Sequence, residues 1–298
     1  MFSLITLFII INHVLPCNSS KFQSSLALTA YQYSLIAFCP PQTISKWSCG
    51  PLCSSLPPLT GILSFQGSNN SFFYIAHETA TNRTYLVFRS SEFRESGSDI
   101  WDLKNDPGWN YTNNCRDQCL VLTKPFFQMQ SLKPYVYGAL EYYWNMTNGT
   151  SLNGLVMTGN GLGGVLAQIF ALEFINDGVT KFGSIELYTF GSPAPGNLAF
   201  FRLAEAKIQS FAIMNKWRVT YNRDECPFIP DRFFQWNDEI FYNLDNKYRI
   251  CESSPSGSLD PLCSNQFREN YNFEDHYKFF KEDAREQVLP CLNTQFDN

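Results

Sequence analysis

The stretch that decides the fold is TGNGLGGVLAQIF, which runs from Thr158 to Phe170. The apolar run GLVMTG at its start predicts a short buried strand, and apolar residues at helical spacing predict a helix over Leu162 to Ile175. Cβ atoms on either side of so sharp a turn would collide, and Gly159 and Gly163 remove them at the outer positions of G-x-S-x-G. Hydrolases that use this turn place a nucleophilic serine at its centre, where this sequence has Gly161. The motif alone favours an ordinary glycine-rich turn.

The same glycines also have the G-x-G-x-x-G spacing of a dinucleotide-binding turn. That site needs an acidic residue at the end of a strand about 20 residues later, and this region of the sequence reads NDGVTKFGS. The formal net charge is −5 and no basic run stands out, which argues against nucleic acid. We therefore expect no nucleotide, no nucleic acid partner and no cofactor.

The beginning of the chain predicts secretion. Its apolar run, from Phe2 to Ile11, is too short to span a bilayer and is typical of a signal peptide. We expect the signal peptide to cover residues 1–17 and a single domain to cover residues 18–298. The run is preceded by no Lys or Arg, so a short membrane anchor stays the alternative. Ten cysteines favour the extracellular space or the secretory-pathway lumen, and glycosylation sequons begin at Asn69, Asn82, Asn110, Asn145 and Asn148.

Strand and helix signals alternate along the chain, which predicts an α/β fold with a largely parallel sheet. A strand in NKWRVTYNRD ends just before Asp224, and His276 lies in a C-terminal segment that we expect to be helical from Asp275 onward. The other histidines are His13, in the signal segment, and His77, on an early strand. The chain order of elbow, Asp and His is that of α/β-hydrolases.

Five strings in this order resemble the class 3 lipase family, the fungal-type triacylglycerol lipases. YLVFRSS resembles the family's F-R-G-[ST] strand, GNGLGGVLAQIFAL resembles G-H-S-L-G-G-A-x-A, and LYTFGSPAPGN, RVTYNRDECPFIP and DHYKFF resemble three further family strings. The similarity runs from about Tyr31 to Cys291. It implies an α/β-hydrolase fold of the fungal-lipase type, with a mostly parallel central sheet flanked by helices. It also implies hydrolysis of acylglycerol esters, with a lipid or acyl ester as ligand and transient contact with a lipid interface.

The resemblance assigns a role to each candidate site residue. Asp224 and His276 match the acid and the base of a Ser-Asp-His triad, and the nucleophilic serine falls on Gly161. Ser91 matches an oxyanion-hole residue, and the backbone N–H of Leu162 would be the second donor.

This chain also departs from the family pattern at other positions. Asn160 replaces the histidine before the nucleophile, and Ser90 replaces a glycine. Cys226 replaces an apolar residue near the expected pocket. The segment SEFRESGSDIWDL is longer than the usual lid, and we expect its Phe93 and Ile100 to cover an apolar cleft. Together these changes indicate relaxed or altered chemistry.

Three functions remain open at this point. The first is a secreted lipase-like protein that binds lipid without serine-type turnover. The second is an active hydrolase with a substitute nucleophile, for which Cys226 is a candidate, although a buried small side chain is the favoured interpretation of that residue. The third is an interaction protein that keeps only the scaffold. Because Gly161 offers no nucleophile, a surface ion pair is also an alternative interpretation of Asp224 and His276.

The cysteines predict a disulfide framework. Without Cys17, in the signal segment, and Cys226, the remaining cysteines allow more than a hundred connectivities, and spacing does not choose among them. A zinc site is poorly supported because no histidine is spaced to complete it, so we expect no metal. The resemblance implies three pairs and leaves two cysteines to form a fourth: Cys39 with Cys291, Cys49 with Cys53, Cys251 with Cys263, and Cys115 with Cys119.

Overall fold

A computed structural model describes residues 21–91, 102–115, 118–146, 154–179, 185–210, 214–252 and 256–293. The expected signal peptide, the lid residues Phe93 and Ile100, and the sequon at Asn148 lie outside these ranges. Within them, no helix combines the length and the apolar character that a bilayer-spanning segment needs.

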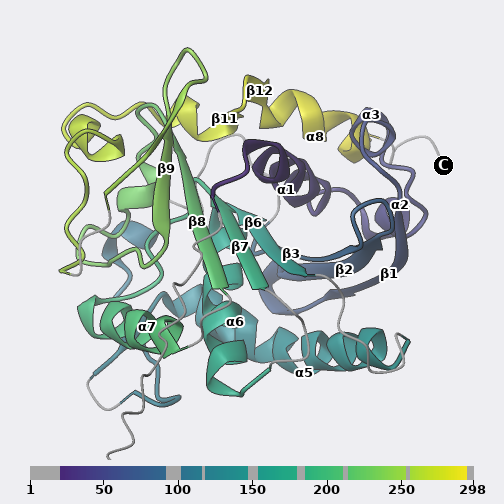
Figure 1. Ribbon diagram of the computed structural model, residues 1–298, viewed down its shortest axis with the longest axis horizontal. Helices are drawn as coiled ribbons and strands as arrows, with labels where there is room; N and C mark the ends of the chain where they lie inside the picture. The colour runs from purple at the N-terminus through teal and green to yellow at the C-terminus, as the bar shows by residue number, and fades with distance from the viewer. Residues whose placement is uncertain are drawn as a thin grey trace, which may run out of the picture.

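The centre of the fold is an eight-stranded sheet in the order β1-β2-β3-β6-β7-β8-β9-β10 (Figure 1). Strands β3, β6, β7, β8 and β9 run parallel, and antiparallel partners extend the sheet at both edges. Every residue of β7 is buried, as expected for a parallel strand that is covered on both faces. The strands span Leu59–Gln66 (β1), Phe72–Glu78 (β2), Arg83–Arg89 (β3), Leu155–Asn160 (β6), Ile185–Phe190 (β7), Met214–Tyr221 (β8), Asp238–Tyr242 (β9) and Tyr248–Ile250 (β10).

Helices cover both faces of this sheet (Figure 1). One face carries α5, α6 and α7, at Thr123–Met146, Leu162–Asn176 and Leu198–Ser210. The other carries α1 and α8, at Ser24–Ile36 and Ala284–Asn293, with the short α2 and α3 nearby, at Pro41–Ser45 and Pro51–Ser54. The side chains of β2 alternate accordingly: Phe73 and Ile75 join the core beneath α5 and α6, whereas Phe72 and Tyr74 join the core beneath α1. The predicted α/β-hydrolase fold with a mostly parallel central sheet is therefore confirmed.

Short elements fill the connections between these helices and strands. Two small antiparallel pairs join β4 to β5 and β11 to β12. The strands are Trp109–Asn110, Leu120–Val121, Lys278–Phe279 and Glu282–Asp283, and the 3-10 helices are Ser68–Asn70, Asp102–Asn105, Cys226–Phe228, Ser264–Phe267 and Phe273–Tyr277.

The C-terminal segment corrects one expectation. A helix from Asp275 onward was expected, but the chain forms the 3-10 helix Phe273–Tyr277 and the β11–β12 hairpin before α8 begins at Ala284. The hairpin turns at Phe280 and Lys281, which both have positive φ, 56° and 67°. A two-residue hairpin turn of type I′ requires positive φ at both central residues, and helical periodicity does not reveal it.

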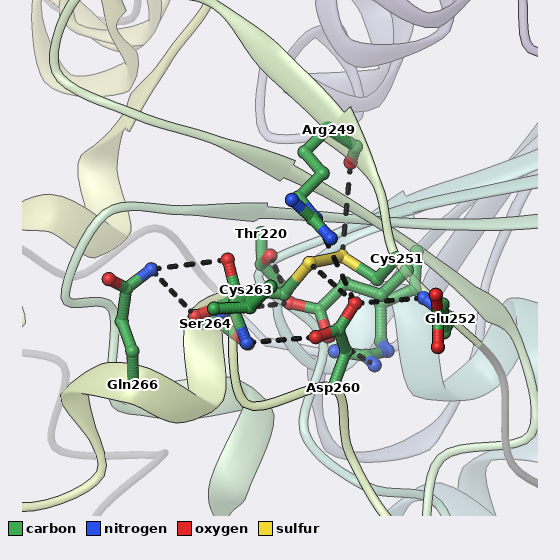
Figure 2. Close-up of a disulfide and its surroundings, with 11 residues drawn as sticks. Thr220, Arg249, Cys251, Glu252, Asp260, Cys263, Ser264 and Gln266 are labelled. Atoms are coloured by element: carbon green, nitrogen blue, oxygen red, sulfur yellow. Dashed lines mark hydrogen bonds and ion pairs between the residues drawn. A yellow bond between two sulfur atoms is a disulfide. The ribbon is translucent and has the colours of Figure 1, made fainter.

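Four disulfides cross-link the fold. Three are the pairs that the family resemblance implies, and the fourth joins Cys115 to Cys119, the two cysteines that were left to pair. The Cys39–Cys291 bond joins the chain just after α1 to α8 across a sequence separation of 252. The Cys251–Cys263 bond lies beside Asp260 (Figure 2), whose carboxylate accepts backbone N–H groups from Glu252 and Leu262. These hydrogen bonds hold the pKa of the Asp260 carboxyl below its usual value.

Candidate active site

The turn at Gly161 has the shape of a nucleophile elbow. Gly161 joins β6 to α6 with φ 53° and ψ −124°, a conformation that side chains rarely adopt, and its N–H donates to the Phe190 carbonyl at 2.9 Å. A Cβ on Gly159 would lie 2.2 Å from the carbonyl carbon of Gly163, and one on Gly163 would lie 2.3 Å from the Phe88 carbonyl oxygen. The two outer glycines are therefore required by the close approach of strand and helix.

Asp224 and His276 form a buried hydrogen-bonded pair behind this turn. The side chains are 1% and 6% exposed, and Asp224 Oδ2 lies 3.2 Å from His276 Nδ1. Because a carboxylate only accepts, Nδ1 carries the hydrogen of this bond, which leaves Nε2 as the ring atom that can take a proton. The burial of both side chains is inconsistent with a surface ion pair.

His276 Nε2 faces the centre of the elbow. A Cβ built on Gly161 would lie 3.5 Å from His276 Nε2 and 3.7 Å from Cε1, and no other described atom, chain neighbours aside, would be within 4 Å of it. The structure thus brings together three residues, from β6–α6, the loop after β8 and the C-terminal 3-10 helix, that are far apart in the sequence.

Gly191, for which no role was predicted, shapes the opposite side of the Asp224–His276 pair. Its φ is 52°, and a Cβ there would lie 2.7 Å from Asp224 Oδ2 and 2.8 Å from His276 Nδ1. A glycine directly after β7, in the string FGSP, is the sequence signal that marks it. Any side chain at Gly191 would push the carboxylate and the imidazole apart.

A second set of hydrogen bonds, which the sequence did not predict, connects the two loops of the site. The buried Asp275 carboxylate accepts from Asn222 Nδ2 at 2.7 Å and from the Arg223 N–H at 3.2 Å. Asn222 and Arg223 precede Asp224, and Asp275 precedes His276, so this contact fixes the acid relative to the base. Phe273 stacks on the imidazole, with ring centroids 5.6 Å apart.

The predicted oxyanion-hole residues stand at the beginning of α6 and just after β3. Leu162 is the first residue of α6, and Ser91 follows β3. The preceding Ser90 is anchored to Gln128 of α5: its hydroxyl donates to Gln128 Oε1, and its carbonyl accepts from Gln128 Nε2 at 2.6 Å. Gln128 thereby fixes the backbone directly before Ser91. The oxyanion-hole roles of Ser91 and Leu162 stay predictions.

Asn160 and Cys226 are the two departures that the structure places nearest to this site. Asn160 Nδ2 is buried with no hydrogen-bond partner among the described residues. Cys226 is fully buried, and its backbone N–H donates to Asp224 Oδ1 at 2.9 Å. Burial, and then the neighbouring Asp224 charge, raise the pKa of the Cys226 thiol well above its usual value. A neutral, enclosed thiol is a poor nucleophile.

We therefore expect Cys226 to resist alkylation in the native protein. Incubation with iodoacetamide at pH 8 should leave the Cys226 peptide unmodified, because the raised pKa keeps the thiol protonated at a pH where free thiols begin to ionise. The same treatment in denaturant should modify it fully, which serves as the control. Peptide mass spectrometry checks both states, and rapid native labelling would contradict the inert assignment.

Sequence comparison matches part of the chain to one family of enzymes. Residues 130–234 match the family described as lipase (class 3). "Lipase ZK262.3" of Caenorhabditis elegans is 32% identical over 74 residues, which are 25% of this chain and 20% of that protein, so this chain matches about a fifth of the length of that relative.

Solved fungal lipases share the fold over most of this chain. Lipase II from Rhizopus niveus has a TM-score of 0.72 at 19% identity, covering 88% of this chain and 97% of its own. Rhizomucor miehei triacylglyceride lipase has a TM-score of 0.73 at 16% identity, covering 91% and 98%. Lip2 lipase from Yarrowia lipolytica has a TM-score of 0.72 at 20% identity, covering 88% and 94%.

A mostly parallel sheet, an elbow between β6 and α6 and a buried Asp–His pair after later strands define an α/β-hydrolase scaffold. Within that class, residues 130–234 match the class 3 lipase family, the family that the motifs resemble.

Proposed function

We propose that this chain binds acyl esters of lipids at the site of Gly161, Asp224 and His276, and that it lacks serine-type turnover. One observation carries the proposal. A Cβ at Gly161 would lie 3.5 Å from His276 Nε2, so an assembled acid–base pair faces a glycine where the family resemblance puts the nucleophilic serine.

The chemistry follows from what this pair retains. In a serine esterase the hydroxyl attacks the ester, the histidine takes its proton, and water later hydrolyses the acyl-enzyme. Here no hydroxyl stands at the elbow, so no acyl-enzyme forms there. Water beside Nε2 would lose a proton to His276 and attack the ester carbonyl. The tetrahedral intermediate then breaks its C–O bond, and His276 returns the proton to the leaving alcohol, which gives slow hydrolysis without an acyl-enzyme. In serine proteases, loss of a triad member leaves about 10³–10⁴-fold catalysis over water.

The setting of this activity is also a proposal. We place the protein in the extracellular space or the secretory-pathway lumen, after removal of residues 1–17, with transient contact to a lipid interface. Four disulfides support an oxidising compartment. The described sequon asparagines are all exposed, as glycosylation requires: Asn69, Asn82, Asn110 and Asn145.

A histidine comparison tests the proposal. We expect the purified chain to hydrolyse p-nitrophenyl butyrate slowly and to resist a fluorophosphonate probe. His276→Ala should lower the residual rate about 100-fold, the lower end of the range for a general base. His77→Ala is the matched control, because His77 lies on β2 and touches neither Asp224 nor Gly161. Fluorophosphonate labelling of the parent would reveal another nucleophile and overturn the proposal.

A further inference from the structure

The missing side chain at Gly161 leaves the base of the site without a nucleophile of its own. A Cβ at Gly161 would meet only His276 among the described residues, chain neighbours aside, at 3.5 Å from Nε2 and 3.7 Å from Cε1. The His276 side chain is 6% exposed and that of Asp224 is 1% exposed, so the imidazole is the part of the pair that a solute reaches. An oxygen atom of a bound molecule therefore has room beside Nε2, where the family resemblance puts the serine hydroxyl.

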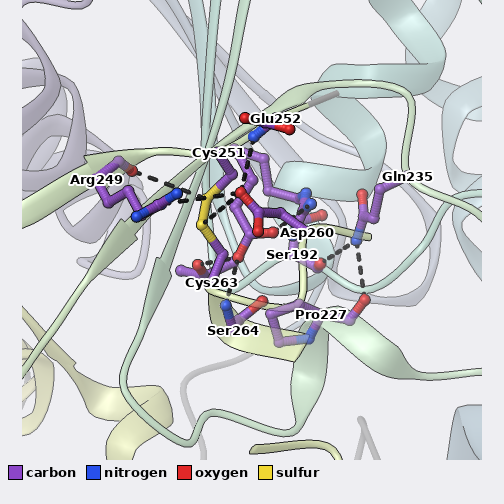
Figure 3. A network of polar contacts seen from close by, with 12 residues as sticks. Ser192, Pro227, Gln235, Arg249, Cys251, Glu252, Asp260, Cys263 and Ser264 are labelled. Carbon is purple, nitrogen blue, oxygen red and sulfur yellow. Dashed lines mark hydrogen bonds and ion pairs between the residues drawn. A yellow bond between two sulfur atoms is a disulfide. The ribbon is translucent and has the colours of Figure 1, made fainter. Parts of the chain in front are cut away.

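The base keeps a fixed direction although no serine side chain holds it. Asp224 Oδ2 lies 3.2 Å from His276 Nδ1, and the loop of Asp224 is held in turn by the buried Gln235. The Nε2 group of Gln235 donates to the carbonyls of Ser192, at 2.7 Å, and Pro227, at 3.2 Å (Figure 3). Ser192 lies in the loop after β7 and Pro227 in the loop after β8, so one amide connects two of the loops around the pair. The imidazole is thus preorganised to take a proton from an oxygen beside it.

A hydroxyl group of the substrate itself has a large kinetic advantage over water at this position. A hydroxyl on the carbon next to the ester arrives with the molecule that binds the site, so its attack on the ester is intramolecular. Effective molarities of well-oriented intramolecular reactions reach about 10⁵–10⁸ M, far above the concentration of liquid water. A substrate that carries such a hydroxyl therefore supplies the nucleophile that Gly161 lacks.

We propose that this site moves acyl groups between neighbouring hydroxyls of a polyol ester such as a monoacylglycerol. The inference rests on the proposed function, because it uses the same base and the same class of ester ligand. It differs in the nucleophile, which is a hydroxyl of the substrate, and in the product, which is a positional isomer of the substrate.

The reaction needs only the base and a donor to the carbonyl oxygen. The free hydroxyl gives its proton to His276 Nε2 while its oxygen attacks the ester carbonyl, which forms a five-membered cyclic intermediate. The N–H of Leu162, which begins α6 and has no intrahelical acceptor, would bind the negative oxygen of this intermediate. The bond between the carbonyl carbon and the original ester oxygen then breaks, and Nε2 returns the proton to that oxygen. No water or other reactant is consumed, and no acyl-enzyme forms.

A pair of soluble esters separates acyl transfer from hydrolysis. The purified chain is incubated with 2-butyrylglycerol, and ¹H NMR follows 1-butyrylglycerol and free butyrate against a buffer blank. We expect isomerisation above the blank to be at least about 100-fold faster than release of butyrate, because the attack is intramolecular. The 1,3-dimethyl ether of 2-butyrylglycerol has no hydroxyl, so it should only release butyrate, slowly. That release measures the proposed hydrolysis alone.

Variants then locate the reaction at the elbow. His276→Ala should lower the isomerisation rate about 100-fold, the lower end of the range for a general base. Gly161→Ala keeps the base but puts a methyl group 3.5 Å from Nε2, and a displacement of the attacking oxygen by about 1 Å should also cost about 100-fold. Gly178→Ala is the matched control and should keep the rate of the parent. Gly178 also has a positive φ, 66°, but a Cβ there would have no described atom within 4 Å.

Three results would overturn the inference. They are isomerisation no faster than the blank, an undiminished rate in His276→Ala, and transfer of butyrate to added deuterated glycerol, which would mean that the acyl group leaves its own glycerol. Isomerisation without release of butyrate from the dimethyl ether would support the inference and contradict only the hydrolysis in the proposed function.

Discussion

Gly161→Ser is expected to hydrolyse p-nitrophenyl butyrate at least about 100-fold faster than the parent chain. The new Cβ would lie 3.5 Å from His276 Nε2, which brings an Oγ within hydrogen-bond reach of the imidazole, about 2.6–3.2 Å. Loss of the nucleophilic serine costs a serine hydrolase about 10⁶-fold in kcat. We expect only part of that factor to return, because Asn160 and Ser90 also differ from the family pattern.

Gly161→Ala is the matched control for this experiment. It carries the same Cβ in the same backbone conformation, with φ 53°, but no hydroxyl. Both variants should lose about 1–3 kcal/mol of stability, the cost of a side chain in a sparsely populated region. Only the serine variant should gain activity and react with a fluorophosphonate, and addition of His276→Ala should remove the gain. A folded Gly161→Ser that keeps the contact between His276 and Asp224 yet is no faster than the parent would refute the idea of a dormant triad.

Removal of the Cys39–Cys291 bond is expected to be the most destabilising change outside the site. The bond closes a loop across 252 positions, and the chain-entropy model gives such a loop a stabilisation of about 5 kcal/mol. In a chain of this size, Cys39→Ala/Cys291→Ala should therefore lower the Tm by about 10 °C or more. Differential scanning calorimetry measures the shift.

The bond between Cys49 and Cys53 gives the matched control. Its sequence separation is only 4, for which the same model gives about 2 kcal/mol. Cys49→Ala/Cys53→Ala should therefore lower the Tm by less than half as much. Equal effects of the two double variants would contradict the loop-length explanation, and peptide mapping that finds Cys39 and Cys291 as free thiols would contradict the pairing itself.

The sequence predicts the parts of this fold that depend on local pattern. The buried strand before Gly161, the helix from Leu162 and the parallel sheet follow from apolar periodicity and glycine spacing, and the structure has them. The hairpin before α8 was missed because positive φ at Phe280 and Lys281 leaves no helical or strand period.

The residues of the site likewise include some that the sequence predicts and others that it does not. Asp224 and His276 were predicted from their chain order and family strings, because each stands in a recognisable string. Gly191, Asp275 and Gln128 act through contacts that are distant in the sequence. Gly191 lies beside Asp224, Asp275 binds Asn222, and Gln128 binds Ser90. A single sequence carries no direct record of such contacts. The string FGSP marks Gly191 as a glycine after a strand, but neither it nor the sequence around Asp275 and Gln128 shows which residues they contact.

The backbone at Gly161 also bears on how this protein can change over generations. The elbow keeps its shape without a side chain at the centre. Gly161 has the elbow's φ and ψ and donates its N–H to Phe190, and Gly159 lies close to Gly163. Two of the glycine codons, GGU and GGC, become serine codons by a single nucleotide change. The surrounding backbone needs no second mutation to accept the serine side chain. The glycine and serine forms of this site can therefore interconvert by one nucleotide change in either direction.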